Sequence, residues 1–156
     1  MIRIKKVHII ILLILASTAI YPAVIENSRC AADQGDMKEI RAVIKGAVED
    51  DSWLYAGDAD YIEKILGNYY EGQLLKKLSR DAWEFNKKNT DWYSRAVLVS
   101  INVKQQDNNQ ATVMAVIDVE DCTTGGRQRG SAVYHISKES GKWRIFNVSY
   151  MWNAEV

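Results

Sequence analysis

Residues 92–120 read WYSRAVLVSINVKQQDNNQATVMAVIDVE, and this stretch decides the fold. Apolar and polar residues alternate with a period of two on both sides of a polar turn at 107–109, which is typical of two β-strands joined as a hairpin. In the first strand, the residues that share one face are Arg95, Val97, Val99, Ile101 and Val103. Because this face is the more apolar of the two, we expect it to pack against the core.

Two further strands follow the hairpin. The alternation returns at 131–138 and again at 141–152, after a loop expected at 123–130 that is rich in glycine and arginine. Four successive strands with short connections predict an antiparallel sheet. On alternation alone, Asp118 and His135 fall on the face opposite to their apolar neighbours in the sequence.

The residues before the sheet have the spacing of helices. Between 36 and 57, apolar residues recur at intervals of three and four, and Asp36 with Glu39 resembles the start of a capping box. Shorter amphipathic segments occupy 59–66, after a capping aspartate, and 73–86. The pattern therefore predicts an α+β fold in which about three helices pack on a curved four-stranded antiparallel sheet.

The first 25 residues have the layout of a signal peptide or a membrane anchor. Arg3, Lys5 and Lys6 precede an apolar run at 7–20 that is short for a membrane span, whereas counting on to residue 25 gives enough length for an anchor. In both cases the basic flank favours a domain outside the cytoplasm, either secreted or periplasmic, or held to the membrane by residues 7–25. The expected organisation is a leader at 1–25, a linker at 26–35 and a domain at 36–156.

Composition limits the classes of function. The chain has 156 residues, enough for one domain with a hydrophobic core, and after residue 32 it carries 16 basic and 19 acidic side chains. A mildly acidic domain is a poor nucleic-acid binder, so we expect no nucleic-acid partner. His135, Cys30 and Cys122 do not have the spacing of metal ligands, and we expect neither a metal nor another cofactor. The two cysteines either pair in an oxidising compartment or stay free thiols.

Several short motifs resemble a known superfamily. They are Ile65-Leu66, Leu74-Leu75 with Leu78, Asp91-Trp92-Tyr93, Ala111-Thr112-Val113 and Gly141-Lys142-Trp143-Arg144-Ile145. Together with the order of helices and strands, they resemble the NTF2-like superfamily, the cystatin-like α+β cones, and within it the IMS domain of plastid and cyanobacterial division proteins and its bacterial relatives. The resemblance implies the fold. It does not imply one activity, since the superfamily includes cofactor-free enzymes as well as domains that only bind small molecules, peptides or proteins.

Two sets of residues are candidates for a site in the cone. An acid–base enzyme would need a carboxylate and a partner donor inside it, and the candidate pair is Asp118 with His135. If the apolar faces of their strands point inward, both side chains point outward and catalysis by this pair is excluded. The aromatic candidates for lining the cone are Tyr55, Tyr61, Tyr93 and Trp143, for which packing alone is the alternative explanation.

The sequence thus predicts a non-enzymatic domain outside the cytoplasmic membrane that binds a partner protein or a small ligand in its cone. The alternative is a small cofactor-free enzyme that performs proton transfer or hydrolysis with Asp118 and His135. The exposed face of the sheet is the candidate surface for a homodimer.

Overall fold

The computed structural model describes residues 34–88 and 93–152. The expected leader at 1–25 and nearly all of the expected linker lie outside these ranges. Within the described part of the chain, no helix is both long and apolar enough to cross a bilayer.

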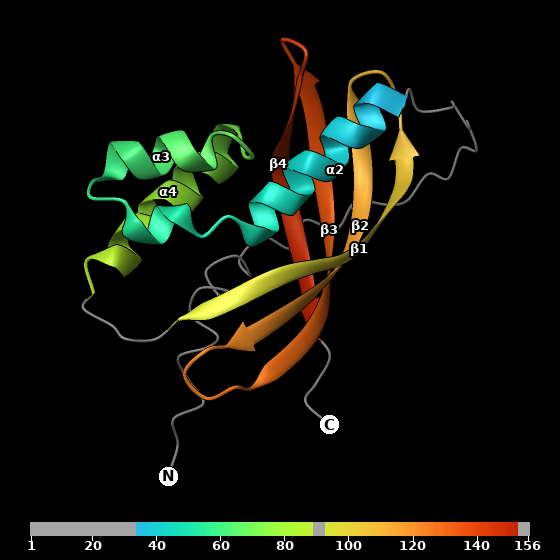
Figure 1. Ribbon diagram of the computed structural model, residues 1–156. Coiled ribbons are helices and arrows are strands. Elements are labelled where there is room, and N and C mark those ends of the chain that lie inside the picture. Colours follow the sequence, from blue (N-terminus) through green and yellow to red (C-terminus); the bar gives the residue numbers. More distant parts are fainter. Residues whose placement is uncertain (1–33, 89–92, 153–156) are drawn as a thin grey trace.

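The helices precede the sheet in the chain and cover one of its faces. The described elements in chain order are α2 (Gln34–Glu49), the 3-10 helix η1 (Ser52–Tyr55), α3 (Ala59–Leu66), α4 (Gly72–Asn86), β1 (Ser94–Gln106), β2 (Gln110–Asp121), β3 (Arg127–Glu139) and β4 (Lys142–Trp152). Helix α2 lies across the curled sheet, and α3 and α4 lie side by side next to it (Figure 1). This arrangement confirms the predicted α+β architecture.

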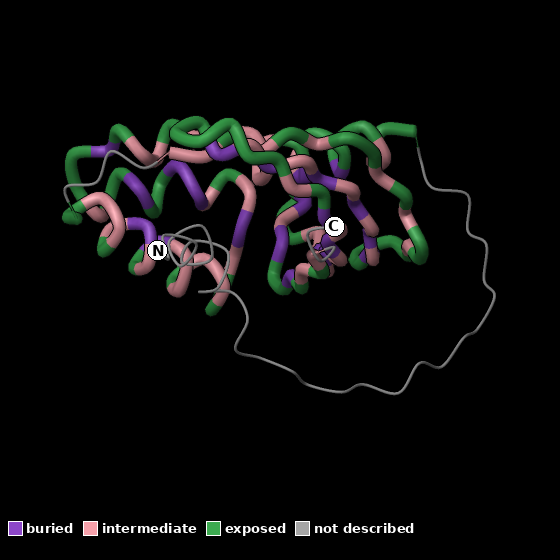
Figure 2. Tube along the Cα trace, turned by 90° about the horizontal axis from the view of Figure 1, so that it is seen from below, coloured by how far each residue is buried: buried purple, intermediate pink, exposed green. Residues whose placement is uncertain are grey.

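The sheet is antiparallel, and its strands follow one another in the order β1-β2-β3-β4. Buried and exposed positions alternate along the strands (Figure 2). The buried apolar side chains of the last three strands are Ala111, Val113, Ala115, Ile117, Val119, Ala132, Tyr134, Ile136, Trp143, Ile145 and Val148. They form the core together with apolar residues of the helices, so the alternation predicted for β2 and β3 is confirmed, and their apolar sets face the helices.

Strand β1 is different, because the single core face predicted for it is wrong. The side chains of Val97 and Val99 are 46% and 47% exposed, although Ile101 and Val103 on the same predicted face pack against the core. A β-bulge after Leu98 shifts the register with β2. Since a shift of one residue moves every later side chain to the other face, the bulge breaks the alternation into two halves of opposite phase.

Strand β3 begins earlier than predicted, at Arg127, so that half of the expected 123–130 loop belongs to the sheet. Both arginines of that segment have carboxylate partners on the neighbouring strand. Arg129 binds Asp118 through two nitrogen–oxygen contacts of 2.6 and 2.7 Å, and Arg127 binds Glu120 at 3.2 Å. These cross-strand pairs explain why a polar, glycine-rich segment continues the ladder.

The first helix, α2, ends at Glu49, whereas the sequence predicted a helix that continues to residue 57. Its last turn has no basic residue and is followed by Asp50 and Asp51, and acidic charge at the negative end of a helix dipole is unfavourable. The Asp50 carboxylate accepts the backbone N–H of Ser52 at 3.0 Å, which turns the chain into η1. By contrast, α3 has the bounds predicted and α4 begins one residue before the predicted start.

The N-terminal end of α2 is fixed to the sheet by Asp36. Its carboxylate accepts a hydrogen bond from Lys138 Nζ and another, at 3.1 Å, from the indole nitrogen of Trp143. The Lys138 ammonium and the Trp143 N–H hold the pKa of the Asp36 carboxyl below its usual value. Asp36 therefore joins α2 to β3 and β4 instead of capping its own helix.

Candidate functional site

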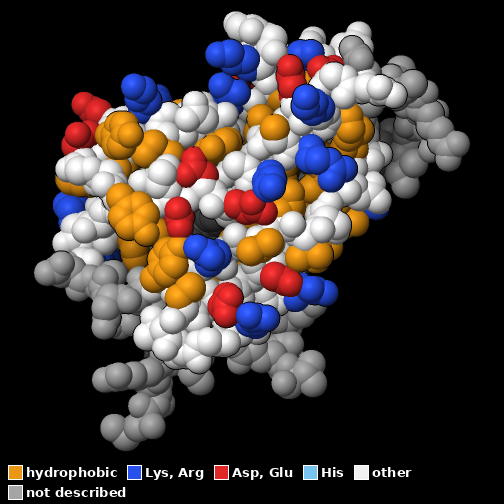
Figure 3. All heavy atoms as spheres, in the orientation of Figure 1, with side chains coloured by type: hydrophobic (Ala, Val, Ile, Leu, Met, Phe, Trp, Pro, Cys, Tyr) orange, Lys and Arg blue, Asp and Glu red, His pale blue; other side chains and the backbone are white. Residues whose placement is uncertain are grey.

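The space between the helices and one end of the sheet contains a cavity of about 220 Å³. That volume is enough for about seven waters at roughly 30 Å³ each, or for one small organic molecule. Its lining comes from the C-terminal part of α2, from η1, from the end of α3 and the chain that follows it, from α4 and from all four strands. The surface is hollowed beside the C-terminal end of α2, where acidic side chains lie around the opening (Figure 3).

The wall of this cavity is rich in aromatic side chains. They are Trp53, Tyr69, Tyr70, Phe85, Tyr134, Tyr150 and Trp152. Tyr150 stacks on Trp152, with ring centroids 5.9 Å apart and planes 7° apart, and it meets Tyr134 edge to face at 6.3 Å. Gly130 makes room for this stack, since a Cβ there would lie 2.4 Å from the Trp152 ring. The strands therefore hold a rigid aromatic floor for the cavity.

Among the described residues, two polar atoms of the cavity lining are buried without a hydrogen-bond partner. They are Asp81 Oδ2 and Trp152 Nε1, whereas the Tyr134 hydroxyl interacts with the hydroxyl of Tyr150. Buried polar groups in folded proteins are nearly always paired, because an unmade hydrogen bond costs about 1–3 kcal/mol. One acceptor and one donor are thus open to a molecule in the cavity.

Asp81 is the member of this set that sequence reasoning missed. It lies on α4 three residues after Leu78 and four residues before Phe85, and all three side chains line the cavity. Its side chain is only 15% exposed, and its one ion pair is a contact of 3.5 Å between Oδ1 and Nε of the exposed Arg80. The signal was present in the sequence, since a carboxylate on the apolar face of a helix is unusual.

Three further carboxylates, from Glu49, Asp50 and Asp51, line the opening of the cavity. Each already has a donor within the protein. Glu49 accepts the backbone N–H of Leu98 at 3.1 Å, Asp50 accepts the Tyr69 hydroxyl at 2.7 Å, and Asp51 accepts the Tyr93 hydroxyl at 2.5 Å. The three consecutive acids are unfavourable for α2, and these bonds keep them at the rim.

The tyrosines of the cavity are neutral hydrogen-bonding groups at physiological pH. Burial, with Asp50 beside it, raises the pKa of Tyr69 to about 12. Burial also raises the pKa of Tyr70, Tyr134 and Tyr150 above the usual value for a tyrosine. Because burial disfavours the phenolate, none of these hydroxyls is poised to act as a base.

The structure does not bring Asp118 and His135 together. Both lie on the outer face of the sheet, where Asp118 pairs with Arg129 in the register and His135 pairs with Thr112. Asp118 and Thr112 are six residues apart on β2, which corresponds to about 20 Å along a strand. Asp118 is occupied by Arg129, which lowers the pKa of its carboxyl, and the His135 ring lies 3.3 Å from the Thr112 hydroxyl. The two side chains therefore form no acid–base pair.

The four aromatic candidates are not among the residues that line the cavity. Tyr55 and Tyr61 are 78% and 53% exposed on η1 and α3. Tyr93 bonds Asp51 behind the rim, and Trp143 is buried in the core at the far end of the sheet, beside Asp36. The aromatic wall is instead formed by residues from η1, from the chain before α4, from the end of α4 and from the inner faces of β3 and β4, which come together only in the folded chain.

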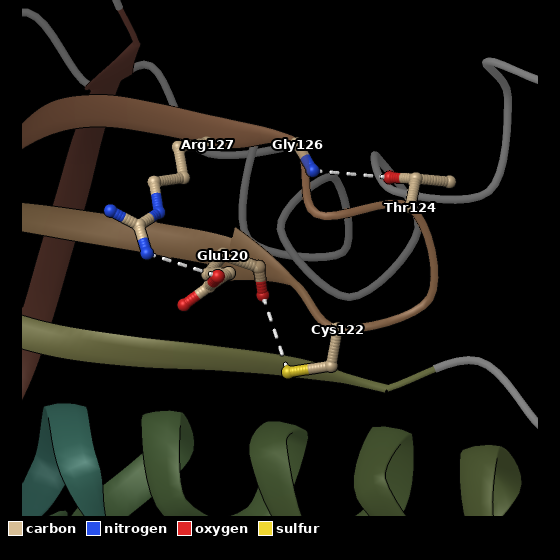
Figure 4. A network of polar contacts seen from close by, with 5 residues as sticks. All are labelled: Glu120, Cys122, Thr124, Gly126 and Arg127. Carbon is tan, nitrogen blue, oxygen red and sulfur yellow. Dashed lines mark hydrogen bonds and ion pairs between the residues drawn. The ribbon is translucent and has the colours of Figure 1, made fainter.

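Cys122 lies in the turn between β2 and β3 and is exposed. Its thiol donates to the Glu120 carbonyl at 3.9 Å, next to the pair of Glu120 with Arg127 and the contact of the Gly126 N–H with Thr124 (Figure 4). Cys30 is outside the described residues, so both alternatives for the two cysteines, a disulfide or free thiols, stay open.

The outer face of the sheet is open to solvent and carries exposed apolar side chains from its edge strands. The most exposed are Val97 and Val99 on β1 and Phe146 and Met151 on β4. A homodimer through this face stays a prediction, and the mass of the protein in concentrated solution tests it: a dimer is expected, and a monomer at every concentration would refute it.

Comparison with known proteins shows the fold. No model of a known protein family matches the chain, and no curated protein does. Among solved structures, a protein of unknown function with a cystatin-like fold from Nostoc punctiforme is similar, with a TM-score of 0.56 and 14% identity over 78% of this chain and 93% of that one. A protein of unknown function from Mycobacterium tuberculosis has a TM-score of 0.59 and 16% identity over 80% of each chain.

A third similar structure is the intermembrane space region of the chloroplast protein ARC6, with a TM-score of 0.50 and 13% identity over 80% of this chain and all of that one. The fold is therefore the cystatin-like, NTF2-like cone. The resemblance that the sequence motifs suggest is confirmed as a likeness of fold. A fold alone does not determine a function, so the residues of the site must show what the cavity can do.

Proposed function

We propose that this domain binds a small, largely apolar ligand in the cavity between its helices and its sheet, and that it catalyses no reaction. The observation that carries the proposal is that apolar walls surround two buried polar atoms, Asp81 Oδ2 and Trp152 Nε1, for which the described residues provide no partner. An apolar pocket with a few convergent polar groups is typical of small-molecule sites. Binding is favoured over catalysis because burial raises the pKa of the cavity tyrosines Tyr69, Tyr70, Tyr134 and Tyr150, so none of them is poised to act as a base.

The binding proposal is tested by filling the cavity. Replacing Ala82, which is buried and lines it, with phenylalanine adds a ring inside the space, whereas Glu84→Phe adds the same ring to an exposed position of the same helix. The probe is 1-naphthylmethanol, a neutral fused aromatic with one hydroxyl, followed by its fluorescence or by calorimetry. We expect Ala82→Phe to weaken its binding at least about tenfold, the equivalent of about 1.4 kcal/mol, and Glu84→Phe to leave it unchanged.

Two results would contradict the binding proposal. One is that the unmodified protein does not bind this probe at any accessible concentration. The other is equal binding by the protein and by Ala82→Phe, since the probe would then sit elsewhere. Circular dichroism of each variant establishes that it is folded, so a loss of binding is not confused with a loss of structure.

The second part of the proposal is that the domain works outside the cytoplasmic membrane. The basic and then apolar order of residues 1–25 supports export. The similar ARC6 region, which lies in an intermembrane space, supports the use of this fold outside a cytoplasm. We expect residues 1–35 fused to alkaline phosphatase, which is active only after export, to give active enzyme in a bacterial host. An inactive fusion would leave the binding proposal intact and refute the location.

A further inference from the structure

The charges that line the cavity are unbalanced. Four carboxylates, from Glu49, Asp50, Asp51 and Asp81, face one guanidinium, from Arg95. Acidic side chains lie around the hollow in Figure 3. In a recess with low-dielectric walls, charges of one sign concentrate the electric field, so the cavity attracts cations and repels anions.

The four carboxylates are not equally available to a ligand. Glu49, Asp50 and Asp51 accept hydrogen bonds from a backbone N–H or a tyrosine hydroxyl, as described above. Asp81 Oδ2 is buried and has no donor among the described residues. A buried acceptor atom without a donor is costly, and although Oδ1 of the same carboxylate contacts Arg80, a cationic donor would satisfy Oδ2 best.

The surroundings of Asp81 suit a cation with an apolar body. The aromatic floor and walls offer ring faces, to which ammonium groups are attracted. Tyr134 is fully buried on the inner face of β3, where its hydroxyl interacts with that of Tyr150, and a hydroxyl oxygen with two lone pairs can accept a further N–H. Trp152 Nε1, also on the sheet, is the second buried atom of the lining without a partner among the described residues, and it is independent of the acidic residues of α2 and α4.

We propose that the ligand of this cavity is a small apolar amine, bound as its ammonium ion, with an N–H that donates to Asp81 and an aromatic or aliphatic body against the ring wall. This inference rests on the proposed function and adds the chemical class of the ligand. A neutral molecule of the same shape fills the same walls but forms a weaker bond with Asp81. An anion of that shape is repelled by the four carboxylates and binds more weakly.

The test compares three probes of nearly one shape at pH 7: 1-naphthylmethylamine, which is protonated, 1-naphthylmethanol, which is neutral, and 1-naphthoic acid, which is ionised. We expect the amine to bind about ten- to a hundredfold more tightly than the alcohol, because a charged hydrogen bond replaces a neutral one. We expect the acid to bind more weakly than the alcohol, and the preference for the amine to fall as salt is added.

Variants then assign the preference to one carboxylate. Asp81→Asn keeps the shape of the side chain and removes its charge, so we expect it to lose most of the difference between amine and alcohol while its affinity for the alcohol stays within about threefold. Asp60→Asn, on an exposed position of α3, removes one charge that is not part of the lining and is expected to keep the full preference.

The outcomes separate this inference from the function it rests on. Equal binding of amine and alcohol by the unmodified protein would refute the amine and leave a cavity that binds neutral molecules. A preference that survives in Asp81→Asn would refute the role of Asp81. Failure of all three probes to bind would overturn the proposed function itself, and the inference with it.

Discussion

Replacing Trp143 with alanine is expected to lower the free energy of unfolding by about 3–5 kcal/mol, the usual cost of removing a large aromatic side chain from a core. Trp143 is 1% exposed, so its ring is part of the core between β4 and the helices. Its indole N–H donates to Asp36 at 3.1 Å and joins β4 to α2. The Lys138 ammonium lies 5.8 Å from the centre of its ring and adds a cation–π contact. Urea unfolding followed by circular dichroism measures the effect.

The matched control is Phe146→Ala, three residues further along β4. Phe146 is 41% exposed on the outer face, so its removal is expected to cost about 1 kcal/mol or less. This comparison also decides the role of Trp143. If Trp143 lined the ligand site instead of the core, Trp143→Ala would cost little more stability than the control and would enlarge the cavity. Equal losses of unfolding free energy in the two variants would therefore contradict the structure described here.

Replacing Asp81 with leucine is expected to raise the free energy of unfolding, by about 1–3 kcal/mol, in the absence of ligand. The change removes a buried carboxylate oxygen that has no donor among the described residues and puts an apolar group among apolar neighbours. Leucine is also the better helix former. The lost contact with Arg80 is worth little, because that arginine is 71% exposed.

The control for this variant is Asp60→Leu, the same exchange on an exposed position of α3, for which we expect a change within about 0.5 kcal/mol. Denaturant unfolding of both variants gives the comparison. A gain in stability with a loss of amine binding is the pattern of a residue kept for function at the expense of stability. A clear loss of stability in Asp81→Leu would mean that the carboxylate is already satisfied in the free protein, and would remove the main reason for assigning a ligand to it.

Local patterns in the sequence were sufficient for most of the fold. The period of two in β2 predicted this strand and its apolar face, the Gly-Lys-Trp-Arg-Ile run predicted the start of β4, and Asp58 marked the start of α3, where its carboxylate accepts the Tyr61 N–H. These elements were predictable because their burial pattern and their caps are set by residues that are neighbours in the chain.

Two elements departed from the pattern for identifiable reasons. The bulge after Leu98 depends on pairing with β2, which alternation within β1 does not reveal. The end of α2 at Glu49 follows from the bonds of Asp50 with Ser52 and Tyr69, and Tyr69 is 19 residues further along the chain. These tertiary contacts end α2 at Glu49, although the helical spacing of apolar residues continues beyond it.

The candidate site was the least predictable part, because its residues come from distant segments. The aromatic candidates were proposed because of their residue type, and residue type alone does not show on which face of the fold a side chain lies. Asp81 could have been found, as the charged residue between Leu78 and Phe85 on the apolar face of α4. Its assignment to a ligand site was not predictable, because only the folded sheet places Tyr134 and Trp152 in the same cavity.

The most direct test of the central claim, that the cavity is a ligand site, is to map by nuclear magnetic resonance where 1-naphthylmethylamine binds on the protein. We expect changes in chemical shift to concentrate on residues of the lining, such as Gly46, Ala82 and Ile117, and on the indole N–H of Trp152. Changes confined to the outer face around Val97 and Phe146, or none at saturating probe, would contradict the account.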